Sequence, residues 1–202
     1  MRSNVCKIEK GTRDLEAIFA ESERVAEYNG LSHKQALQLR LLCEEIDGML
    51  PHIIDEFEGK LWIDFEDGVC KVNVSVEIPD FNTEKKAELI SIAKNKKNAA
   101  AVGIVGKIRN AIENFFLDES TAVAFAATFH PSVGVYDNVN YSYLWSLQQY
   151  KNTVSQEESA AWDELEKSVI ASVADDVIVG VKGKCAEIVI VKDFSAVSEN
   201  DA

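Results

Sequence analysis

Few residues in this chain have types and positions that could do chemistry. Two adjacent carboxylates, Glu44 and Glu45, lie in LQLRLLCEEIDGMLPHII, where apolar residues recur at helical spacing. Further along, NAAAVGIVGKIRN predicts a helix start in which Gly103 and Gly106 leave backbone amides bare and Lys107 adds a positive charge. Such a start suits a phosphate. The simpler alternatives are a solvated helix edge for the glutamates and close helix packing for the glycines.

The cysteines and histidines predict no catalytic or metal site. The cysteines are Cys6, Cys43, Cys70 and Cys185. Their separation excludes the paired C-x-x-C spacing of a structural zinc site, so we expect small buried hydrophobes in a reducing compartment. The three histidines stand in no arrangement with a serine or cysteine and an orienting acid. We therefore expect no metal and no hydrolase triad.

The charge balance narrows the classes of partner. The 202 residues include 34 acidic and 21 basic side chains, giving a net charge of -13. This charge repels nucleic acid phosphates and anionic lipid, so neither is an expected partner. The first residues lack the apolar run of a secretory signal, and no apolar stretch approaches the roughly 20 residues that span a bilayer. We expect a cytoplasmic protein with one domain over residues 1–194 and a disordered tail over 195–202.

The first half of the sequence predicts two helices and a hairpin. A helix over 13–28 ends at Asn29-Gly30. A capping box of Ser32 and Gln35 then opens a helix over 32–54, whose last turn Pro51 should kink or loosen. Alternating apolar residues over 61–66 and 70–78 flank a turn at Asp67-Gly68 and predict a β-hairpin.

The second half predicts the remaining elements of one two-layer sandwich. Helices are expected over 82–93, 99–116 and 156–174, an irregular insertion over about 117–150, and a final hairpin over 176–192. In both hairpins apolar and polar residues alternate, as when one side of a sheet packs on helices and the other faces water. The fold class is therefore α+β, with an antiparallel or mixed sheet covered by helices on one face.

The order helix, helix, hairpin, variable region, helix, hairpin resembles the GHKL superfamily. Its members include sensor histidine kinases, type II topoisomerases, heat-shock chaperones and bacterial anti-sigma-factor serine kinases. The small anti-sigma kinases look most similar. LQLRLLCEEIDGMLPHII with the strand pair after it, and SVIASVADDVIVGVKGKCAEIVIVKDF, carry the resemblance over roughly half the chain. The resemblance implies the histidine kinase-like ATPase fold.

The resemblance also implies roles for the glutamates. In the family, a glutamate on the second helix activates a water or hydroxyl, and an asparagine one turn later ligates magnesium. Either Glu44 or Glu45 would be the catalytic residue here. The residue four positions on is Gly48 or Met49, and neither offers the oxygen ligand that magnesium prefers. The resemblance therefore implies an ATPase or serine/threonine kinase whose phosphoryl transfer is impaired, unless another oxygen ligand such as Asp47 replaces the asparagine.

The nucleotide-binding boxes are matched in part. In the family, an aspartate after the second strand accepts a hydrogen bond from adenine, with glycines two and four residues on. Asp80 stands at this place, and Asn82 takes the place of the first glycine. Gly103, Gly106 and Lys107 are the candidates for the second, phosphate-facing box. ATP or ADP is the ligand that these residues imply, and an aspartate after a proline is otherwise a turn or helix-cap residue.

Two functions follow from the resemblance. The first is a nucleotide-binding regulator, similar to the anti-sigma kinases, that controls a partner protein and could form a homodimer. The second is a non-catalytic interaction module that has lost the nucleotide site. A two-layer α/β binding domain unrelated to the family is the third possibility, because a fold alone does not determine a function.

Overall fold

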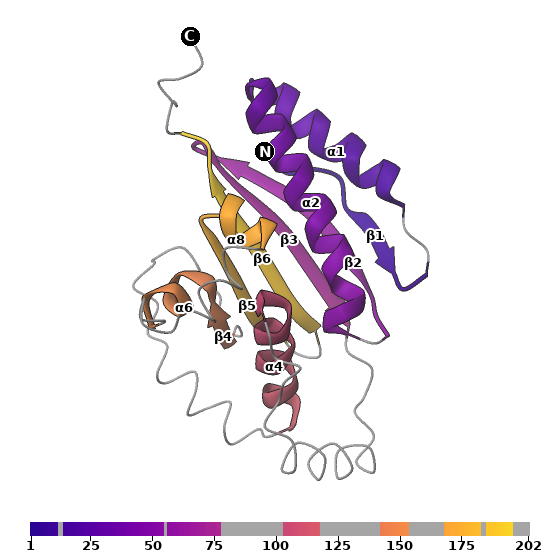
Figure 1. The fold of residues 1–202 in the computed structure, drawn as a ribbon. Coiled ribbons are helices and arrows are strands. Elements are labelled where there is room, and N and C mark those ends of the chain that lie inside the picture. The colour runs from indigo at the N-terminus through magenta and orange to yellow at the C-terminus, as the bar shows by residue number, and fades with distance from the viewer. Residues whose placement is uncertain are drawn as a thin grey trace.

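A computed structural model describes residues 1–11, 14–54, 56–77, 103–117, 142–153, 168–182 and 185–195. Its centre is a six-stranded antiparallel sheet with strand order β1-β2-β3-β6-β5-β4 (Figure 1). The two predicted hairpins, β2 (Glu58–Glu66) with β3 (Val69–Glu77) and β5 (Asp176–Lys182) with β6 (Cys185–Asp193), form part of this one sheet. This confirms the predicted α+β class with an antiparallel sheet.

Local signals explain the first two helices. Helix α1 (Leu15–Tyr28) begins where the Asp14 side chain accepts a hydrogen bond from the Ala17 amide. Helix α2 (His33–Ile53) begins at the predicted capping box of Ser32 and Gln35. It continues through Pro51 to Ile53, so the proline does not end the helix.

The sequence also encodes the pairing of the sheet. In the β2–β3 turn, Asp67 and Gly68 have φ of 51° and 83°, a left-handed pair that suits a tight hairpin. The register places Val74 opposite Leu61 on one side and Ile188 on the other. Strand β3 thus pairs with β6 and joins the two hairpins at the middle of the sheet.

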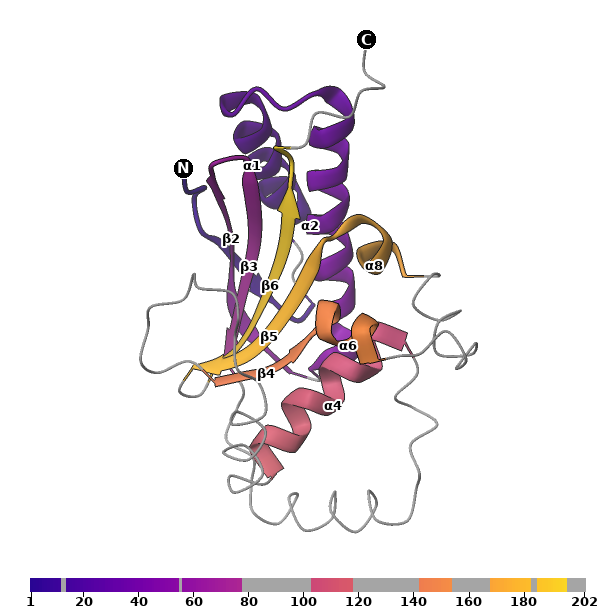
Figure 2. The same cartoon turned by 90° about the vertical axis from the view of Figure 1, so that its left-hand side faces the viewer.

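The helices cover one face of the sheet, as predicted (Figure 2). Helix α2 packs against α1, against α4 (Gly103–Leu117) and against α8 (Val169–Val173). Beneath them, alternate strand residues are buried, among them Leu61, Ile63, Val72, Val74, Val179 and Ile188. The opposite face is more polar: Arg2, Trp62 and Asn73 all donate hydrogen bonds to the Asp64 carboxylate.

Two strands and a helix were not predicted. Strand β1 (Cys6–Glu9) pairs with β2 at one edge of the sheet, and β4 (Ser142–Ser146) pairs with β5 at the other. Helix α6 (Leu147–Thr153) follows β4 directly. The prediction of irregular structure up to about residue 150 is therefore wrong for 142–150. These elements span four to seven residues, which is too short for a hydrophobic period to show.

Some predictions lie outside the described residues. They include the helix over 82–93, the first part of the helix over 156–174 with its capping box, and the tail after residue 195. The predicted helix over 99–116 corresponds to α4, and α8 corresponds to the end of the helix over 156–174. No helix within the described ranges is long and apolar enough to cross a membrane.

Candidate functional site

The candidate site is built on α2, whose 21 residues present three distinct sides. The inner side is buried in the core by Leu39, Leu42, Cys43, Ile46, Leu50 and Ile53. The outer side carries Leu37, Leu41, Glu44 and Gly48, which recur at helical spacing and are at least partly exposed. Glu44 thus belongs to the outer stripe. Glu45 and Met49 share a flank between the two sides, because they are one helical turn apart.

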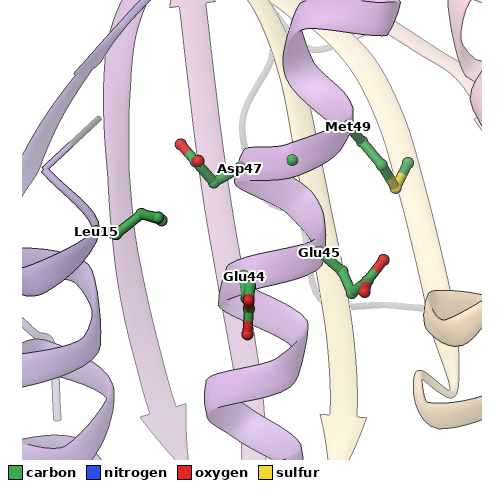
Figure 3. Close-up of a pocket in the computed structure, with 6 residues that line it drawn as sticks. Leu15, Glu44, Glu45, Asp47 and Met49 are labelled. Atoms are coloured by element: carbon green, nitrogen blue, oxygen red, sulfur yellow. The ribbon is translucent and has the colours of Figure 1, made fainter. Parts of the chain in front are cut away.

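A hollow of about 350 Å³ adjoins this part of the helix. The described residues that line it are Leu15, Glu44, Glu45, Asp47, Gly48 and Met49 (Figure 3). In the close-up, Asp47 points to the side of α2 on which Leu15 of α1 lies, whereas Glu45 and Met49 project from the other side. Asp47 is only 5% exposed, so it meets the hollow from within the α1–α2 packing.

The charge of the hollow is uniformly negative among its described lining residues. Glu44, Glu45 and Asp47 bring three carboxylates, and none of the described lining residues is basic. Within the described ranges, neither Glu44 nor Glu45 forms an ion pair. Glutamates elsewhere differ: Glu23, for example, is 2.7 Å from an arginine and Glu56 is 2.8 Å from a lysine. The hollow therefore attracts cationic groups and repels phosphates.

The structure shows what stands one turn after each glutamate in the two alignments that the sequence left open. In one, Glu45 is followed on the same flank by Met49, which is 7% exposed and part of the hydrophobic core. In the other, Glu44 is followed on the outer stripe by Gly48, which has no side chain. In both, the position one turn after the glutamate lacks a side-chain oxygen, so the hard ligand that magnesium prefers is missing there.

The candidate phosphate residues lie on α4. Gly103 is its first residue and has a φ of 75°, while Gly106 is buried. The Lys107 ammonium lies 5.1 Å from the centre of the Tyr150 ring on α6, so its charge takes part in a cation–π contact. Helix α4 packs against α2, yet none of these three residues lines the hollow. Asp80 and Asn82 lie outside the described residues.

The buried thiols offer little reactivity. Cys6, Cys43 and Cys70 are enclosed, as predicted, and Cys185 is partly exposed. Burial raises the pKa of Cys43, and the neighbouring thiols of Cys70 and Cys6 raise it further. Burial also raises the pKa of Cys70 to about 12, so the nucleophilic thiolate is scarce at neutral pH. No group of three potential ligand side chains in the described part of the chain could hold a metal ion.

Comparisons of this chain with protein-family models, with curated proteins and with solved structures found no match. The arrangement along α2 therefore has to be interpreted from its own chemistry. Sequence reasoning missed Leu15, which lines the hollow, and considered Gly48 only as a position without a magnesium ligand. A glycine inside a strong helical pattern was a usable signal for Gly48, because such a residue lowers helix stability and commonly has a packing or functional reason. No sequence signal brought Leu15 to the site, since that depends on how α1 packs.

Proposed function

We propose that this chain is a regulatory protein of the histidine kinase-like ATPase fold that controls a partner protein by binding it and binds ATP or ADP weakly at most. Two features support the fold assignment. After β1, the chain runs through two helices, a hairpin, a middle region that contains α4, β4 and α6, a helix and a hairpin, which agrees with the order that the resemblance implies. The sheet is antiparallel and its helices lie on one face.

The observation that carries the proposal is the buried thioether of Met49, one turn after Glu45 on the same flank of α2. In the family that position holds the asparagine that ligates magnesium. A thioether is a soft ligand and does not replace an oxygen at a magnesium ion. Without the metal, the triphosphate would face the carboxylates of Glu44 and Glu45 unscreened. Phosphoryl transfer is therefore disfavoured, and regulation by binding is the function that remains.

Nucleotide titration tests the proposal directly. If Asp80 retains the adenine contact, ATP and ADP bind with similar, weak affinity and little dependence on magnesium, and hydrolysis is negligible. Calorimetry with and without magnesium measures this, and Asp80→Asn should abolish the binding. Met49→Asn is the matched gain-of-function variant: it restores an oxygen ligand one turn after Glu45, so it should make ATP binding depend on magnesium.

The second candidate is an interaction module that has lost the nucleotide site altogether. The negative lining of the hollow favours it, because three carboxylates repel phosphates at short range. The absence of nucleotide binding to both the wild-type chain and Asp80→Asn would select this candidate. Tight magnesium-dependent ATP binding, with turnover abolished by Glu45→Ala or Glu44→Ala, would contradict both and would mean that another oxygen ligand, for example Asp47, replaces the asparagine.

A further inference from the structure

Gly48 leaves the backbone of α2 bare in the middle of the helix. A Cβ atom added there would meet no other atom within 4 Å, so no neighbouring group requires the glycine. Its φ is also not positive, and so its backbone conformation suits any residue. Glycine is less favourable than alanine inside a helix, so α2 is less stable with Gly48 than it would be with an alanine at this position. A bare backbone permits another chain to approach closely.

The outer stripe that ends at Gly48 is apolar at its other end. Leu37 is 52% exposed, one of the few large apolar side chains left in solvent among the described residues. Leu41, one turn further, is partly exposed. Leu37, Leu41, Glu44 and Gly48 therefore form a strip along three turns of α2, on which a segment of another protein can lie.

The carboxylates at this strip specify the chemistry of the occupant, because Arg40, one turn before Glu44, is already paired with Glu23 at 2.7 Å. Glu44 lies within the strip and Glu45 lies next to it, and neither has an ionic partner in the part of the chain that the structure describes. An arginine suits them best, because its planar guanidinium can bind a carboxylate through two hydrogen bonds. Its aliphatic stem can pack on the bare helix backbone at Gly48, which lines the same hollow. The net charge of -13 adds a long-range attraction for a basic partner.

We propose that the outer face of α2, from Leu37 to Gly48, is the docking site for an arginine-bearing segment of a partner protein. An arginine of that segment enters the hollow and pairs with Glu44 and Glu45. Its backbone crosses α2 at Gly48, and its apolar side chains cover Leu37 and Leu41. This inference rests on the proposed function, since it names the surface through which the partner is bound.

A defined probe tests the site. The probe is a fluorescein-labelled amphipathic peptide of about 16 residues, roughly four helical turns, with leucines and with arginines spaced by one turn. Binding to the full chain is followed by fluorescence anisotropy at about 0.15 M salt, where distant charges are screened. Glu44→Gln with Glu45→Gln should weaken binding at least about tenfold. Gly48→Ala should weaken it at least about fivefold while raising the urea midpoint of unfolding by roughly 0.3–0.5 M.

A matched charge control separates a site from general attraction. Glu27→Gln with Glu66→Gln removes the same charge from two exposed glutamates outside the hollow, and should change the affinity less than about twofold. Equal weakening by the two double variants, or unchanged affinity in Gly48→Ala, would overturn the proposal. So would the absence of binding to the wild-type chain up to about 1 mM peptide. ATP titrations of the same proteins report on the proposed function separately, because they use a different titrant.

Discussion

At the scale of single residues, the thiols of Cys43 and Cys70 are shielded from solvent, whereas Glu44 and Glu45 are at least partly exposed. Cys43 is fully enclosed between α2 and the sheet, and Cys70 lies on the buried face of β3. Removing a thiol from water penalises its charged form, which is why the pKa of both groups rises. These two thiols therefore resist chemical modification and also couple folding to proton binding.

The first prediction is a loss of stability at alkaline pH. An unfolded thiol titrates near pH 9, whereas Cys70 titrates near 12 when folded. The stabilisation is therefore complete below pH 9 and is lost as the pH rises toward 12. Each such thiol should lower the free energy of unfolding by up to about 1.4 kcal/mol per pH unit in this window. Urea unfolding at about pH 8, 9 and 10 measures the slope.

Other groups also titrate in this range, so a variant has to isolate the thiol. Cys70→Ala removes one titrating group, and its stability should fall less steeply above about pH 9 even though it is less stable at neutral pH. Parallel slopes in the wild-type chain and the variant would contradict the assignment. Cys43→Ala provides an independent repeat, because that thiol also has a raised pKa.

The candidate site was only partly predictable at this scale. The acidic pair and the missing asparagine could be found from the residues around Glu44 and Glu45. The spacing also pairs Glu45 with Met49, but it could not show that Glu44, Glu45 and Asp47 line one hollow, because that depends on how α2 packs against its neighbours. The hollow itself depends on tertiary packing, which places Leu15 and Gly48 in one lining although more than thirty residues of sequence separate them.

At the scale of elements, Gln35 links the start of α2 to the end of the sheet. Its Oε1 atom accepts a hydrogen bond of 2.9 Å from the Ser32 amide, which is half of the capping box. Its Nε2 atom donates a hydrogen bond of 3.1 Å to the carbonyl of Phe194, just after β6. One side chain thus fixes the helix start and holds it against a segment more than a hundred residues away.

The second prediction separates these two roles. Gln35→Glu keeps the capping box, since glutamate is a normal residue at this position, but removes the donor to Phe194. It should lower the free energy of unfolding by about 0.5–1.5 kcal/mol. Gln35→Ala loses both contacts and should cost about 1–3 kcal/mol. Chemical denaturation of both variants gives the order, and a Gln35→Glu protein as stable as the wild-type chain would show that the link to Phe194 contributes nothing.

The elements that could be predicted are those with strong internal signals. Helix α2 has a capping box and a long buried stripe, and the two hairpins combine alternation with turn residues. Strands β1 and β4 have neither, and they exist because the edges of β2 and β5 offer backbone partners. Such strands are determined by tertiary pairing, so a single sequence pattern does not reveal them.

At the scale of the whole molecule, the sheet makes one unit from two distant parts of the chain. Strand β3 pairs with β6 along nine residues, from Val69 opposite Asp193 to Glu77 opposite Cys185. The pairing lies at the middle of the sheet, and its alternate residues face the helices and are almost completely buried: Val72, Val74, Ile188 and Ile190. Because the β3–β6 pairing and the hydrophobic core against it belong to both hairpins, neither hairpin should unfold without the other.

The third prediction tests this cooperativity with Ile188→Ala. Ile188 is 0% exposed and lies in β6 between Val74 of β3 and Val179 of β5, so its truncation leaves a cavity beside the β3–β6 pairing. The cost should be about 2–5 kcal/mol. If the sheet unfolds as one unit, the free energy of the opening that permits amide hydrogen exchange should fall by the same amount in β2 as in β5, although β2 is not paired with β6. Leu37→Ala is the control, because it removes a comparable side chain from an exposed position and should change stability by less than about 0.5 kcal/mol. Faster exchange confined to β5 and β6, with β2 as protected as in the wild-type chain, would show instead that the two hairpins are separate folding units held together only in the native state.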